Sequence, residues 1–327
     1  MMRKIISFTI TILLLLAVII WSVSAGSIKL GLFDLIHGLI TGDNEEAAVI
    51  RDLRFPRIIV ALLTGATLAV SGALLQAVLR NPLADAGVIG ISSGAGFVSV
   101  LMVTIFPTVF FWMPMFSFLG GVLAFFLVYS LSWKSGLTPT RLLLVGVAIN
   151  ATFSGLGQSF NYRGSYAVTS VNQAISSIFT MKTWTDVHVL GLYGSIGLLL
   201  SLLVIPWCNV LALQDKTAGS LGMRVARTRI VISIIAVLLA SVATAVGGLI
   251  SFVGLLIPHI TRLLVGSDHK LVIPFSMLAG ALLVLAADTL GRTVVAPTEV
   301  PASIILTVIG GPFLVFMLRK WGREYGA

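Results

Sequence analysis

The sequence predicts an all-α membrane protein with about ten transmembrane helices in a single domain that covers residues 1–327. Of the 327 residues, 57% are hydrophobic and only 10% are charged, and the apolar residues gather in long runs between short polar segments. A soluble domain usually has about a quarter charged residues, so this composition argues against a soluble fold. Because the backbone must satisfy its own hydrogen bonds in the bilayer, apolar runs of about 20 residues indicate helices.

The first apolar run follows a short basic segment, as in a secretory signal peptide. Because many further runs follow it, we expect it to be retained as a helix. The run at Phe252–Val265 is short and contains Pro258, His259 and Arg262, so we expect a tilted, broken or partly buried helix there. The predicted helices cover Ile5–Ala25, Ile58–Leu79, Val88–Phe106, Phe116–Leu131, Leu142–Phe160, Val189–Leu211, Ile230–Ile250, Phe252–Val265, Leu271–Leu290 and Ser303–Leu318.

The basic residues predict that both termini are cytoplasmic. With the N-terminus inside, fourteen of the 21 Lys and Arg residues fall on inner segments and seven on outer ones, as the positive-inside rule expects. The net charge of +9 is therefore a topology signal and does not indicate nucleic-acid binding. The longest inner segment, Gln214–Arg229, could form one or two short amphipathic helices. It is either a solvated connector or a contact for a partner.

Small residues are concentrated in several runs, including Gly65–Gly72, Gly87–Gly96 and Gly247–Gly254. Such residues let membrane helices approach one another closely, so these stretches predict tight helix packing. A smooth translocation path between moving helices is the alternative interpretation.

The sequence lacks the motifs of ATP-binding enzymes and metallohydrolases, and its one match to a serine-hydrolase motif lies in the wrong context. It contains no Walker A phosphate loop and no His-Glu-x-x-His motif, and its single cysteine, Cys208, cannot form a thiolate cluster. Gly90–Gly94 matches the G-x-S-x-G nucleophile motif, but it lies in a predicted membrane helix and does not follow a strand. We therefore expect no catalytic residue, no metal site and no cofactor in this chain.

Ionisable residues within membrane helices can indicate ion-coupled transport. Asp288 is the clearest example, and Arg292 lies one helical turn later, so we expect a structural pair. A proton relay through Asp288, in a proton-coupled secondary transporter, is the alternative. Arg51, Arg54 and Arg57 gather before the second helix against the positive-inside trend. They either snorkel to the interface or receive an acidic partner from outside.

Several segments resemble the FecCD-type permeases, which belong to bacterial ABC importers of iron siderophores, haem and vitamin B12. Each segment is weakly specific, but together they are highly specific and extend over nearly the whole chain. They are Leu53–Arg57, Gly65–Gln76, Asn81–Ala95, Thr140–Val147, Ser251–Arg262, Ala287–Arg292, Glu299–Pro301 and Ile309–Pro312.

The resemblance implies a type II importer permease, similar to the vitamin B12 permease, in the bacterial cytoplasmic membrane. Its partners would be membrane lipid, a second permease that is identical or paralogous, two ATPase subunits that hold ATP and Mg²⁺, and an extracytoplasmic substrate-binding protein. The cargo would be an iron complex, and the sequence does not distinguish haem from a siderophore.

The resemblance also implies site residues. The binding protein would dock on Arg54, Arg57 and Arg292. The cytoplasmic gate would consist of Thr138, Pro139 and Thr140, although Pro139 departs from the small hydroxyl residues that are common at this position. A coupling loop at about residues 212–229 would contact the ATPase through Gln214, Asp215, Ala218, Leu221 and Gly222.

Overall fold

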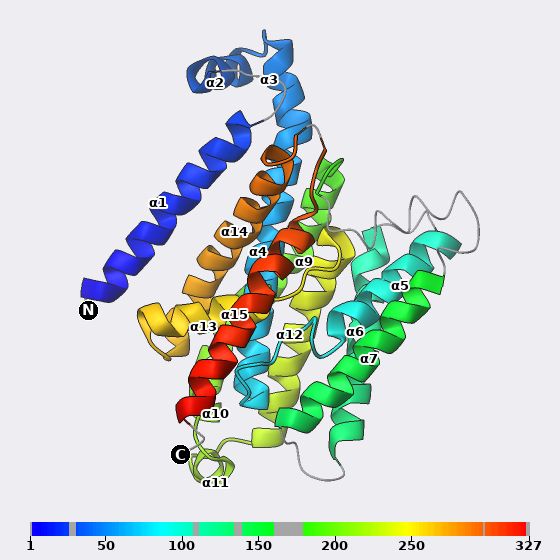
Figure 1. Cartoon of the computed structure of the whole chain (residues 1–327), viewed down its shortest axis with the longest axis vertical. Coiled ribbons are helices and arrows are strands. Elements are labelled where there is room, and N and C mark those ends of the chain that lie inside the picture. The colour runs from blue at the N-terminus through cyan, green and yellow to red at the C-terminus, as the bar shows by residue number, and fades with distance from the viewer. Residues whose placement is uncertain are drawn as a thin grey trace.

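The computed structural model describes residues 2–25, 31–106, 111–133, 139–159, 179–296 and 298–324, and all regular structure in these ranges is helical. α2 and α3 lie at one end of the molecule, and α10 and α11 lie at the opposite end (Figure 1). The helices are α1 (Met2–Ser24), α2 (Leu32–Thr41), α3 (Glu45–Val49), the π-helix η1 (Ile50–Arg54), α4 (Phe55–Leu79), α5 (Ile91–Ile105), α6 (Met113–Trp133), α7 (Pro139–Ser159), α9 (Trp184–Leu203), α10 (Ile205–Leu211), α11 (Asp215–Ser220), α12 (Val225–Gly247), α13 (Val253–Val265), α14 (His269–Thr293) and α15 (Ala302–Glu324).

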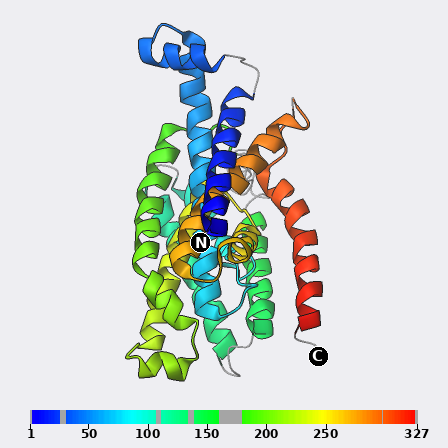
Figure 2. The ribbon, with the colours of Figure 1, turned by 90° about the vertical axis from the view of Figure 1, so that its left-hand side faces the viewer.

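Seven helical segments in the described ranges are long and apolar enough to cross a membrane. They are α1, the continuous segment from α3 to α4, α6, α7, α9, α12 and α14, whereas α5, α13 and α15 contain shorter apolar helices. Each apolar run in the sequence therefore corresponds to helix, but the number of membrane spans stays a prediction. α1 lies on the outside of the bundle (Figure 2), and its largely exposed apolar side chains suit contact with lipid.

Two regions differ from the sequence prediction. The run predicted from Val189 to Leu211 is divided at Val204 into α9 and α10, because Pro206 lacks a backbone N–H and favours the first turn of a new helix. Residues 32–54 form α2, α3 and η1, which contain no long apolar run and were not predicted. Asn44 starts α3 by accepting hydrogen bonds from two backbone N–H groups of its first turn.

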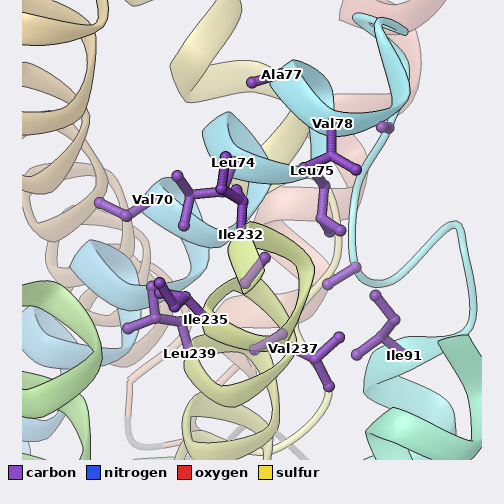
Figure 3. Packing of buried hydrophobic residues seen from close by; sticks show 14 of the residues in the cluster. Val70, Leu74, Leu75, Ala77, Val78, Ile91, Ile232, Ile235, Val237 and Leu239 are labelled. Carbon is purple, nitrogen blue, oxygen red and sulfur yellow. The ribbon is translucent and has the colours of Figure 1, made fainter. Parts of the chain in front are cut away.

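α4 and α12 form the centre of the bundle and are its most buried candidate spans. Leu74 and Leu75 of α4 belong to one buried cluster with Ile232 and Leu239 of α12, and Figure 3 shows these side chains close together. Lipid tails are as apolar as these side chains, so close van der Waals contact stabilises the cluster more than exclusion of water does.

Glycines let α4 approach two neighbouring helices closely. Gly65 faces Gly280 of α14, and Gly72 faces Gly254 of α13. A Cβ atom added to Gly65 or Gly72 would overlap the backbone carbonyl of the facing glycine. The predicted tight packing of small residues is therefore confirmed around α4.

α13 runs across the axis of the bundle (Figure 1) and begins inside the protein. Its 13 residues are not interrupted at Pro258. A helix of this length measures about 20 Å, which is shorter than the hydrocarbon core of a bilayer. The Asp85 carboxylate accepts hydrogen bonds from the backbone N–H groups of Gly254 and Leu255 in the first turn of α13. It therefore supports the first turn of α13, where the Leu255 N–H also donates to Phe252 O at 3.1 Å.

Candidate functional site

Arg57 lies in the first turn of α4 and forms an ion pair with Asp288 of α14. Arg57 Nη2 lies 2.8 Å from Asp288 Oδ1, and Arg57 Nε lies 2.9 Å from Asp288 Oδ2. Arg57 Nη1 lies 3.0 Å from Glu299 Oε1, and the Thr180 hydroxyl donates to the other carboxylate oxygen of Glu299. We call Arg57, Asp288 and Glu299 the outer network. It joins α4 and α14 to the loop before α15.

Arg292 does not form the predicted ion pair with Asp288. Its guanidinium donates instead to backbone oxygens at the C-terminus of α1, including Ala25 O at 3.1 Å. Arg54 also donates to a backbone oxygen there. The last carbonyls of a helix have no partner within the helix, so these two arginines cap the C-terminus of α1. Asp288 pairs instead with Arg57, which is distant in sequence and lies on a neighbouring helix.

The three arginines of the predicted docking surface thus gather at one end of the bundle, and each is engaged within the chain. Arg57 is only 9% exposed, so a partner could reach it only if the outer network opened. Arg54 and Arg292 are partly exposed. The exposed Arg51 pairs with Asp52, with 3.0 Å between Arg51 Nε and Asp52 Oδ1. Docking through Arg54, Arg57 and Arg292 stays a prediction.

Glu299 is the accessible member of the outer network, with 32% of its side chain exposed. Partial burial raises the pKa of the Glu299 carboxyl, but hydrogen bonds from Arg57 and Thr180 outweigh burial and hold this pKa below its ordinary value of 4.5. Glu299 is therefore ionised at neutral pH and contributes a second negative charge beside Arg57.

The five residues of the predicted ATPase contact lie in and around α11. Gln214 precedes α11 and Asp215 begins it. Ala218 is fully buried and fixes α11 against the bundle, whereas Leu221 is 66% exposed. Gly222 has a φ of +83°, which glycine adopts without strain. The segment therefore presents an exposed apolar side chain at the end of the bundle. Contact with an ATPase through it stays a prediction.

Arg80 follows the last turn of α4 and bonds to the connection between α10 and α11. Arg80 Nε donates to Leu211 O at 2.8 Å, and Arg80 Nη2 donates to Leu213 O and lies 2.6 Å from Asp215 Oδ1. Arg229, in the first turns of α12, donates to both carboxylate oxygens of Asp215 at 3.0 and 3.2 Å. We call Arg80, Asp215 and Arg229 the inner network.

The backbone of Arg80 is strained. Its φ of 47° and ψ of 38° are left-handed, a conformation that costs a residue with a side chain about 1–2 kcal/mol. Such strain persists where the surrounding contacts over-determine the conformation, as the acceptors of Arg80 do. A cavity of about 380 Å³ adjoins the network and is lined by Val78, Leu79, Arg80, Tyr129, Leu142, Asp215 and Arg229.

The predicted gate residues are close in sequence to Leu142, which lines this cavity. Thr138 is outside the described residues, and Pro139 and Thr140 are the first two residues of α7. Proline suits the first turn of a helix because its missing N–H would have no partner there. Leu142, one half-turn further along α7, lines the cavity beside the inner network. The role of these residues as a gate stays a prediction.

Asp85 is a structural residue that sequence reasoning did not single out. It is 3% exposed and also accepts a hydrogen bond from the Gly87 backbone N–H at 2.6 Å. Nearby, Gln76 Nε2 donates to Gly254 O at 3.2 Å, and Gln76 Oε1 accepts a hydrogen bond from Arg262. The sequence feature that could have identified Asp85 is its position as an acidic residue between two glycine-rich apolar runs. Among the described residues, no group of His, Cys, Asp and Glu side chains could hold a metal ion.

The chain matches the model of the FecCD transport family over residues 14–320. The protein called "Probable heme-iron transport system permease protein IsdF" from Staphylococcus aureus strains MSSA476 and Newman is 40% identical to it over 322 residues, which are 98% of each chain. One relative is therefore a permease of a transport system.

Two solved structures share the fold. One, described as "An inward-facing conformation of a putative metal-chelate type ABC transporter", has a TM-score of 0.80 and 30% sequence identity, and covers 96% of this chain and 99% of that one. The other, PsaBC from Streptococcus pneumoniae in complex with Fab, has a TM-score of 0.61 and 16% identity, and covers 88% and 95% of the two chains. The second likeness shows the fold alone.

These findings agree with the bundle of membrane helices and with the motifs in the sequence. Since the similar proteins are transport permeases, the chain is a multi-pass membrane subunit of an ABC transporter and not itself an enzyme. The chain belongs to the FecCD transport family.

Proposed function

We propose that this permease belongs to an ABC importer that moves an iron complex, haem or a ferric siderophore, across the bacterial cytoplasmic membrane. The observation that carries the proposal is the 40% identity with a haem-iron permease over 98% of both chains. The 30% identical structure of a metal-chelate transporter supports the same class of cargo. Haem is the first cargo to test, because the more similar of these two relatives is named for it.

In this proposal the chain is one transmembrane domain that crosses the bilayer ten times, with both termini in the cytoplasm. The excess of Lys and Arg on the inner segments supports this orientation. α13 would complete one crossing together with residues 248–252, which are not helical. Non-helical backbone is tolerated at this depth where protein surrounds it, and Ile250 is buried.

The proposed assembly contains a second permease, identical or paralogous, two ATPase subunits that bind ATP and Mg²⁺, and an extracytoplasmic binding protein. α11, with Leu221 exposed at the inner end, is the proposed ATPase contact. The outer end, with Arg54 and Arg292 partly exposed above the outer network, is the proposed docking surface. Approach of the two ATPases would move the helices so that the path opens alternately to each side, without chemistry on the cargo.

A proton-coupled secondary transporter is not favoured. That alternative depended on Asp288 as a proton carrier. In the structure, both Asp288 oxygens accept hydrogen bonds from Arg57, a group that stays charged at all physiological pH values. This arrangement is a fixed ion pair between α4 and α14.

The proposal is tested by reconstituting the chain with its cognate ATPase and binding protein in nanodiscs and liposomes. We expect ATP hydrolysis to be stimulated by the binding protein loaded with haem, or with one ferric siderophore, and uptake into liposomes to require ATP. Uptake driven by an imposed proton gradient without ATP would refute the proposal. Failure of the chain to assemble with any ATPase would also refute it.

Docking is tested separately by the affinity of the binding protein for the reconstituted transporter. Replacing Arg54 by glutamine should weaken binding by about tenfold, because one charged contact at an interface is worth about 1.4 kcal/mol or more. Arg51→Gln is the matched control, because Arg51 is exposed and already pairs with its neighbour Asp52. Equal affinities of the two variants would remove Arg54 from the docking surface.

A further inference from the structure

We propose that the inner network is the link through which movement of α11 reaches α4, and that Arg80 is the residue that positions this link. The inference rests on the proposed function, because it assigns the route by which an ATPase acting on α11 would move the bundle. It concerns the two arginines that hold α11 in place, Arg80 and Arg229, which are not among the residues predicted to touch the ATPase.

Arg80 is bonded to both ends of the α10–α11 connection. Leu211 O belongs to the last turn of α10, Leu213 O lies between the helices, and Asp215 begins α11. Leu211 O is one of the carbonyls that a helix C-terminus leaves without a partner, so Arg80 takes the place of a helix cap. One side chain from α4 therefore fixes where α10 ends and where α11 starts.

Asp215 is shared with a second central helix. Arg80 Nη2 and Arg229 Nη2 lie 2.6 and 3.0 Å from the same Asp215 oxygen, Oδ1. The side chains of Arg80 and Arg229 are 34% and 20% exposed, against 51% for Asp215, so Asp215 is the most solvent-exposed residue of the inner network. A displacement of α11 must therefore move the two arginines or break their bonds. Their helices, α4 and α12, are the most buried candidate spans of the bundle.

α4 can carry such a movement to the opposite end of the protein. It is a continuous helix of 25 residues, Phe55–Leu79, with Arg57 of the outer network in its first turn and Arg80 directly after its last. A helix of this length measures about 37 Å and moves as a rigid element. The cavity of about 380 Å³ beside Arg80 gives the inner end room to shift towards α6 and α7.

The link is tested first in the purified permease alone, by amide hydrogen exchange. Arg80→Gly suits this test because glycine adopts the left-handed backbone of position 80 without strain, so only the side-chain bonds are lost. We expect amides of residues 211–220 to exchange at least about tenfold faster in Arg80→Gly and Asp215→Asn, while those of α13 are unchanged. Lys270→Gln, which removes an exposed charge from the start of α14, is the control. Unchanged exchange of α11 in Arg80→Gly would overturn the inference.

The second test uses the complete transporter with haem-loaded binding protein and measures uptake per ATP hydrolysed. Arg80→Gly, at a residue outside the predicted ATPase contact, should assemble with the ATPase as the wild type does, yet lose at least about fivefold in this ratio, the low end of typical coupling between sites. A wild-type ratio in Arg80→Gly would overturn the inference and leave the proposed function intact. A wild-type chain that forms no complex with an ATPase would overturn the function and, with it, the coupling role of the inner network.

Discussion

The ion pair between Arg57 and Asp288 makes a strong prediction about stability. Asp288→Leu leaves the Arg57 charge in a site where its side chain is only 10% exposed, after loss of the bonds at 2.8 and 2.9 Å. Breaking a buried pair in this way costs about 3–5 kcal/mol. Glu299 keeps one contact with Arg57 at 3.0 Å, so we expect a loss near the lower end, about 3 kcal/mol.

The free energy of unfolding can be measured by titration with sodium dodecyl sulfate in mixed micelles. Asp52→Asn is the control, because the exposed pair Arg51–Asp52 should contribute nothing measurable. The double variant Arg57→Met/Asp288→Leu should recover most of the lost stability, since replacing both partners of a buried pair by apolar residues is often neutral. If Asp288→Leu matched Asp52→Asn, or if the double variant were less stable than Asp288→Leu, this reasoning would be refuted.

Three further predictions use the same titration or amide exchange. Gly72→Val should destabilise the protein by about 2 kcal/mol because the new side chain separates α4 from α13. Gly155→Val on α7 serves as control, because a Cβ atom added to Gly155 meets no atom within 4 Å. The pKa of Glu299 is lowered on folding, so its contribution to stability is present above about pH 4.5 and is lost as the pH falls through the folded pKa. Glu299→Gln should therefore flatten the dependence of the unfolding free energy on pH in this range. An unchanged dependence would exclude a stabilising contact between Glu299 and Arg57. Asp85→Ala should accelerate exchange at residues 253–257, since each buried donor left without a partner costs about 1–3 kcal/mol, and protection equal to the wild type would show that Asp85 does not hold α13.

Sequence reasoning found the helices because a bilayer imposes a single, simple requirement of length and apolarity. The same reasoning missed α2 and α3, which lie outside the long apolar runs, and joined α9 to α10 across Pro206 because the residues on both sides are apolar. Hydropathy reports contact with lipid, and it does not detect helices that are too short to span a bilayer or a helix boundary within an apolar run.

The networks at the two ends of α4 were only partly predictable. Arg57 and Asp288 are 231 positions apart, and the nearer Arg292 offered a pair that the fold does not make. Asp215 was identified through the family resemblance, but its partner Arg80 carries no signal in the sequence, because a left-handed arginine is set by tertiary contacts and not by local propensity. Long-range pairing of charges is decided by which helices become neighbours, and one sequence does not state this.

The shortness of α13 has a consequence for how the chain enters the membrane during synthesis. A segment of 13 residues with Pro258, His259 and Arg262 is a poor candidate for independent insertion by a translocon. Its first turn is completed by Asp85, and its close backbone contact is with Gly72, so both supports belong to segments made earlier. Its C-terminal neighbour α14 is made later and packs against both α13 and α4. We therefore expect α13 to reach its final place only after α14 has been synthesised, as a late step of assembly within the bilayer.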